Sequence, residues 1–86
     1  MLQPYWIKSR GRLPGPVAAF GAGITERSVQ DAAALFRLAF GEDHEVQSIM
    51  PIMNMREIEQ NHVALNMGNA LRRGIWFPLG FDHVSN

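Results

Sequence analysis

Apolar runs along the chain predict four β-strands. Tyr5–Arg10 partly alternates and is rich in aromatic and β-branched side chains, as strands are. Val17–Ile24 is apolar at nearly every position, which predicts an interior strand covered on both faces. His44–Ile52 spaces apolar side chains between polar ones, and Pro51 indicates an edge or an end. Gly74–Pro78, which contains a Trp-Phe pair, predicts the last strand.

A helix is predicted from about Ser28 to Phe40. Ser28 and Asp31 match a capping box, and Thr25 is a rival cap one turn earlier. Gly41 is expected to end the helix. Apolar residues at helical spacing mark its buried face, namely Val29, Ala32, Ala33, Phe36, Ala39 and Phe40.

A second, shorter helix is predicted after a capping signal that runs from Asn54 to Glu57. One face of this helix would carry Met55, Ile58, His62 and Leu65. Gly68 is expected to close the helix in the left-handed conformation. The turn that follows would then set where the next residues emerge.

The element order strand-strand-helix-strand-helix-strand predicts an α+β fold. We expect a single small two-layer sandwich with about four strands and two helices on one face. The passage from Val17 to Ile52 should be a right-handed crossover, so its two strands would be parallel if they share the sheet. Residues 1–86 are expected to form one domain, with residues 79–86 as a loose tail. Such a topology hosts many functions and therefore decides none.

Composition narrows the function classes. The chain has 86 residues and no cysteine. The absence of cysteine excludes a disulfide scaffold, a zinc ribbon and a thiol nucleophile. The absence of cysteine favours the cytoplasm. Eight basic residues balance eight acidic ones, so there is no long-range attraction to nucleic acid or anionic lipid. The longest uncharged run, Leu13–Thr25, is too short to span a membrane, and nothing at Met1 resembles a signal peptide.

The most informative stretch is residues 61–78, which joins a histidine, asparagines around a glycine, an arginine pair and a Trp-Phe block. Asn66 to Asn69 predicts a shaped turn that delivers Arg72 and Arg73 to a sheet edge. The same pattern also fits a helix stop followed by a core strand. The candidate binding residues are His62, Asn66, Asn69, Arg72, Arg73 and Trp76.

Complete catalytic and cofactor motifs are missing. Gly21 and Gly23 lie between a strand and a helix, but Glu26 stands where a dinucleotide fingerprint needs its third glycine, so a bulge or close backbone approach explains them better. Glu59 and His62 have the spacing of di-iron helices, which need further carboxylates from other long helices. The acidic segment 42–45 fits a solvated loop. We therefore predict no cofactor and no metal.

The leading hypothesis is a small cytoplasmic protein-interaction module without evident catalytic activity, which forms a dimer or binds another protein. A domain of this size has a limited interior, so some large apolar side chains should stay accessible and mark a partner site. The candidates for such a patch are Met50, Met53, Trp6, Trp76 and Phe81.

Two alternatives belong to other classes. A nucleic-acid-binding accessory protein would use cations of the first and last strands beside two tryptophans, if those strands are neighbours. The residues involved are Lys8, Arg10, Arg12, Arg72, Arg73, Trp6 and Trp76. A small-molecule-binding domain or enzyme would instead be centred on His62 and its asparagines. A histidine at this position more often bonds a backbone group inside the fold.

Overall fold

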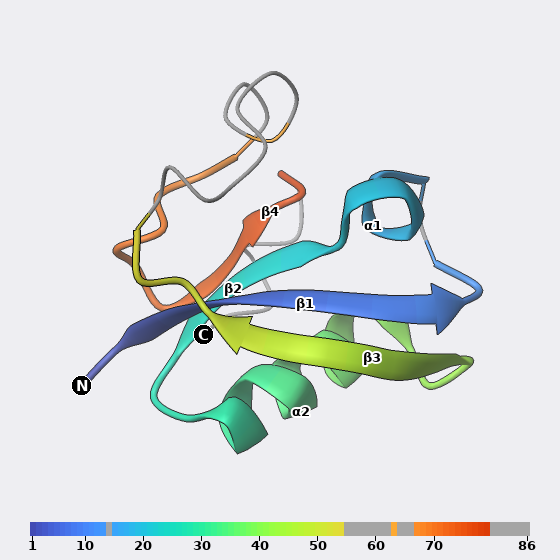
Figure 1. Cartoon of the computed structure of the whole chain (residues 1–86), viewed down its shortest axis with the longest axis horizontal. Helices are drawn as coiled ribbons and strands as arrows, with labels where there is room; N and C mark the ends of the chain where they lie inside the picture. Colours follow the sequence, from blue (N-terminus) through green and yellow to red (C-terminus); the bar gives the residue numbers. More distant parts are fainter. Residues whose placement is uncertain (14, 55–62, 64–66, 80–86) are drawn as a thin grey trace.

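A four-stranded antiparallel sheet with two helices forms the framework of the computed structural model, which describes residues 1–13, 15–54, 63 and 67–79 (Figure 1). The elements in chain order are β1 (Gln3–Gly11), α1 (Gly15–Phe20), β2 (Ala22–Glu26), α2 (Val29–Phe40), β3 (His44–Pro51) and β4 (Gly74–Phe77). The strand order is β3-β1-β2-β4. The predicted α+β class with a four-stranded sheet is confirmed.

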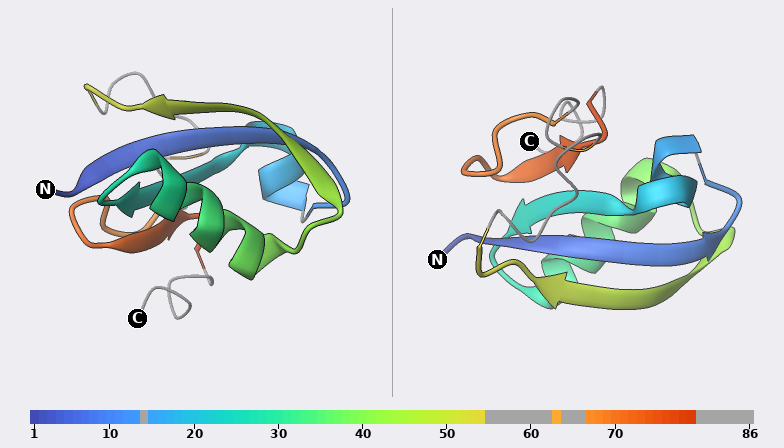
Figure 2. Two further views of the ribbon diagram at one scale, coloured as in Figure 1. Left: turned by 90° about the horizontal axis from the view of Figure 1, so that it is seen from below. Right: turned by 45° about the horizontal axis from the view of Figure 1, so that its top comes forward.

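The strand directions agree with the predicted crossover. β1 pairs antiparallel with both β2 and β3, so β2 and β3 run parallel to each other with β1 between them. α2 connects these two strands. β4 pairs antiparallel with the free side of β2. In both views of Figure 2, β3 borders the sheet on one side and β4 on the other. The prediction of an edge strand that ends near Pro51 is thus confirmed.

The strand predicted over Val17–Ile24 is wrong in its first half. Residues 17–20 belong to helix α1, and β2 begins only at Ala22. Gly21 separates the two elements: its φ is +107°, and its N–H donates to the carbonyl of Val17 at 2.9 Å. A short continuous apolar run fits a buried strand and a buried helical turn equally well, so its pattern could not distinguish them.

The boundaries of α2 are confirmed. The Ser28 hydroxyl accepts a hydrogen bond from the Asp31 N–H at 3.1 Å, and Gly41, with φ +81°, donates its N–H to the Arg37 carbonyl at 2.9 Å. The buried stripe is displaced from the predicted one, because Val29 is exposed and Leu35 is buried in its place. The buried residues of α2 are Ala32, Leu35, Phe36 and Phe40.

Apolar side chains pack on both faces of the sheet. The face under α2 forms one core cluster with Tyr5, Ile7, Val17, Ala22, Ile24, Ala32, Leu35, Phe36, Phe40 and Ile75. Alternation along β1 and β2 turns Trp6 and Gly23 to the opposite face. There Ile52, Val63, Ala70, Trp76 and Phe77 form a second cluster, against which Trp6, Phe20 and Met67 pack. The second predicted helix lies largely at positions 55–62 and 64–66, outside the described residues.

Candidate functional site

The turn before β4 is built by Asn69. Its side-chain Oδ1 accepts from the Leu71 N–H at 2.9 Å, and its carbonyl accepts from the Arg72 N–H at 3.2 Å. An asparagine that bonds the backbone two residues on is a common turn device. The predicted left-handed conformation of Gly68 is wrong, since the glycine with positive φ in this stretch is Gly74, at +123°. Gly68 instead donates its N–H to the carbonyl of Trp76.

Thr25 ties this turn to the sheet. Its hydroxyl donates to the Ala70 carbonyl at 2.6 Å and accepts from the Trp76 indole N–H at 3.1 Å. The Trp76 ring covers Gly23, where an added Cβ would lie 2.4 Å from the ring. Thr25 is therefore a buried strand residue, and the alternative helix cap predicted at this position is wrong. The close approach predicted at Gly23 is confirmed.

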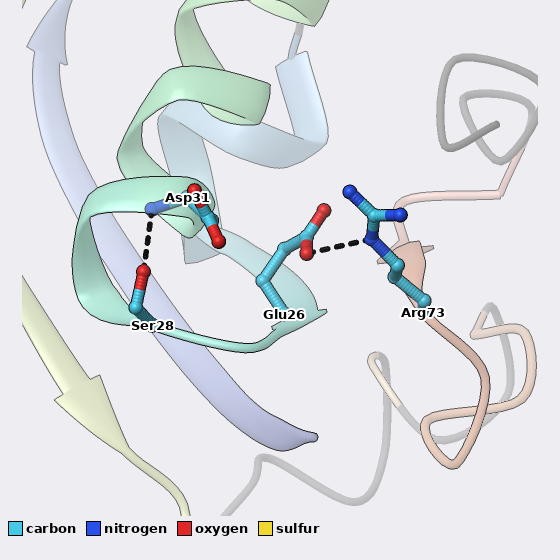
Figure 3. A network of polar contacts seen from close by, with 4 residues as sticks. All are labelled: Glu26, Ser28, Asp31 and Arg73. Carbon is cyan, nitrogen blue, oxygen red and sulfur yellow. Dashed lines mark hydrogen bonds and ion pairs between the residues drawn. The ribbon is translucent and has the colours of Figure 1, made fainter. Parts of the chain in front are cut away.

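An ion pair between Glu26 and Arg73 also connects this turn to the sheet, and no local sequence pattern indicates it (Figure 3). Arg73 Nε donates to Glu26 Oε1 at 2.8 Å, and only 4% of the Glu26 side chain is exposed. The hydrogen bond to Glu26 and then the charge of Glu26 raise the pKa of Arg73; desolvation opposes this rise, and the charge of Asp31 adds to it less strongly. A buried carboxylate needs such a partner, so Arg73 has a structural role.

The turn, β4 and Leu79 line a small, open hollow with a cavity volume of about 40 Å³. Its lining consists of Gly68, Asn69, Arg72, Arg73, Gly74, Ile75, Trp76 and Leu79. Four of the six candidate binding residues therefore meet there: Asn69, Arg72, Arg73 and Trp76. His62 and Asn66 lie outside the described residues. Leu79, which the sequence placed in a loose tail, is a wall of the hollow.

The nucleic-acid alternative required the first and last strands to be neighbours in the sheet, and they are not. β2 lies between β1 and β4, so the cations of the first and last strands do not share a sheet edge. The Trp76 side chain is 2% exposed. Trp6 donates its indole N–H to the Phe20 carbonyl at 3.0 Å and stacks on Phe77, with ring centroids 5.6 Å apart. Trp76 therefore offers no free face of the kind that single-stranded nucleic acid stacks on, and one face of the partly buried Trp6 is occupied by Phe77.

Two of the predicted exposed apolar side chains lie near the outer edge of β3, Met50 at the end of the strand and Met53 just after it. No described residue pairs with this edge. Met50 is 61% exposed and Met53 is 80% exposed. Trp76, named as a member of the same accessible set, is buried instead, and Phe81 lies outside the described residues.

Metal chemistry has no support in the part of the chain that the structure describes, where no three histidine or acidic side chains come together as ligands. His44, in the acidic segment, packs edge-on against Phe36 with ring centroids 4.8 Å apart. None of the helices at the described positions has the length and apolarity needed to cross a bilayer. No family model matches the chain, and neither a curated protein nor a solved structure matches it significantly.

Proposed function

We propose that this chain is a small protein-interaction module that self-associates by pairing the outer edges of two β3 strands. The observation that carries the proposal is the edge itself. β3 spans eight residues, bonds to β1 on one side, and meets no described residue on the other. The outward backbone groups of such a strand are a template for another strand.

A second copy of the chain suits this edge. A two-fold axis would pair the two strands antiparallel, so the same surface serves both copies. The Glu45 end of one strand would then lie beside the Met50 end of the other, which keeps the two carboxylates apart. The β1–β3 register shift beside Lys8 and the missing N–H of Pro51 shorten the stretch that can pair. We therefore expect a modest, concentration-dependent association.

Apolar side chains at one corner of the sheet add contact area near this edge. Gln3 Nε2 donates to the Ile52 carbonyl at 3.0 Å, so the chain end of β3 stays beside the start of β1. Exposed Met53 follows directly after Ile52, Leu2 precedes Gln3 and is 39% exposed, and Met50 lies near the end of β3. Unbranched methionines adapt to irregular partner surfaces. Absence of cysteine from the sequence supports a cytoplasmic location for the module.

Sedimentation equilibrium over a range of protein concentrations tests the proposal. The variant pair Met50→Glu and Met53→Glu, combined in one chain, places charge on the edge. Leu38→Glu is the matched control, because Leu38 is 69% exposed on α2 and away from β3. We expect the parent and the control to dimerise with rising concentration and the edge variant to stay monomeric. A monomeric parent, or an edge variant that dimerises like the control, would refute it.

A further inference from the structure

We propose that the hollow beside β4 binds a small oxyanion, a phosphate or a carboxylate, with Arg72 as its charged ligand. This site is independent of the β3 edge, because β4 borders the opposite side of the sheet. Arg72 and Arg73 line the hollow, and only one of the two has an ion-pair partner among the described residues. Arg73 is held by Glu26, whereas Arg72 is exposed and forms no ion pair with any described residue.

Arg72 and Asn69 both present hydrogen-bond donors at the hollow. The Oδ1 and carbonyl oxygen of Asn69 both accept from the turn backbone, which leaves the Asn69 amide Nδ2 as a donor. The Trp76 carbonyl accepts from Gly68. None of the described residues that line the hollow carries a carboxylate. A guanidinium beside an amide donor, without a competing carboxylate, matches the planar or tetrahedral oxygens of a small oxyanion.

The walls of the hollow are held before any ligand arrives. Thr25 fixes the Ala70 carbonyl, and the ion pair of Arg73 with Glu26 fixes the residue next to Arg72. Gly74 adopts a φ of +123°, where a side chain would be strained. A rigid turn saves the ordering cost that a flexible loop would incur on binding.

The test is a titration of the full chain, followed by amide chemical shifts, with sodium phosphate and separately with sodium acetate. Sodium chloride keeps the ionic strength constant. We expect saturable shifts of the Gly68 and Gly74 amides with at least one of the two anions. Saturation by phosphate alone, by acetate alone or by both supports the site and identifies which oxyanion chemistry it takes.

Variants assign the binding to Arg72. Arg72→Gln should weaken binding at least tenfold, and Arg72→Lys should weaken it less, since lysine keeps the charge but loses the planar fork. Arg37→Gln is the matched control, an exposed arginine in the last turn of α2, and should bind like the parent. Shifts that fail to saturate with both anions, or that persist unchanged in folded Arg72→Gln, would overturn the proposal.

Discussion

Alanine at position 11 should be far more damaging than alanine at position 68. Gly11 ends β1 with a φ of +130°, and an added Cβ would lie 2.5 Å from the Asp43 carbonyl oxygen and 2.7 Å from the His44 Cα. Both neighbours are backbone atoms. The Arg12 N–H donates to the same Asp43 carbonyl at 3.1 Å, so this carbonyl cannot move without losing a hydrogen bond.

The sizes of the two effects follow from the local geometry. At position 11, the unfavourable backbone conformation costs about 1–3 kcal/mol. Overpacking against the Asp43 carbonyl costs roughly another 1–3 kcal/mol. At position 68 the new Cβ would be 3.5 Å from Leu79 Cδ2, an ordinary contact, and φ is not left-handed. Gly68→Ala should therefore be neutral or stabilise the fold by about 0.4–1 kcal/mol, because alanine lowers the conformational entropy of the unfolded chain.

Urea unfolding followed by tryptophan fluorescence measures both variants against the parent. In a parallel thermal melt, each kcal/mol corresponds to a shift of the melting temperature of about 4–8 °C for a domain of this size, so the two variants should separate clearly. From the sequence alone, Gly68 is expected to be the left-handed residue that closes a helix, so a side chain there would be expected to cost more than one at Gly11. Equal losses of stability, or a larger loss for Gly68→Ala, would show that the geometry at Gly11 is not as described.

Three further substitutions test the core and its polar ties. Phe36→Ala should lower the free energy of unfolding by about 3–5 kcal/mol, because the ring is fully buried. Leu38→Ala, on the exposed face of the same helix, should change it by less than about 0.5 kcal/mol. Denaturant curves of the two variants that coincide would contradict this difference. Thr25→Val leaves the Ala70 carbonyl and the Trp76 indole N–H without their partner, which should cost about 1–3 kcal/mol for each group. It should also alter the near-ultraviolet circular dichroism of Trp76, and an unchanged spectrum would argue against the hydrogen bond from Trp76 to Thr25. Ser9→Ala should be neutral or stabilising by up to about 1 kcal/mol, since its buried hydroxyl has no partner among the described residues, and a clear loss of stability would reveal one.

The parts of the fold that depend on local chemistry were predictable. The start of α2 at Ser28 and its end at Gly41 follow from hydrogen bonds within a few residues. The strand β3 and its end at Pro51 follow from composition and the missing proline N–H. The helical turn of α1 was not predictable, because its apolar residues fit a strand equally well and the decision rests on how they pack.

The candidate site was predictable only in part, for a physical reason. Asn69, Arg72 and Trp76 lie close together in sequence, so their grouping around one turn follows from the chain itself. The hydrogen bonds that give these residues different roles join positions far apart in the sequence. Arg73 bonds Glu26 across 47 positions, and Trp76 bonds Thr25 across 51. No local pattern encodes such pairs. Sequence therefore grouped four residues that meet at the hollow, but it did not predict that Arg73 is structural while Arg72 is free of any described ion pair.

Hydrogen exchange of the β3 backbone at low and high protein concentration tests the central claim most directly. The inward amides of β3 are held by β1 at any concentration, and α2 serves as an internal reference. If two copies pair through this edge, the outward amides between His44 and Pro51 should exchange more slowly as concentration rises, while those of α2 stay constant. Outward β3 amides that exchange equally fast at every concentration would contradict the proposed edge pairing.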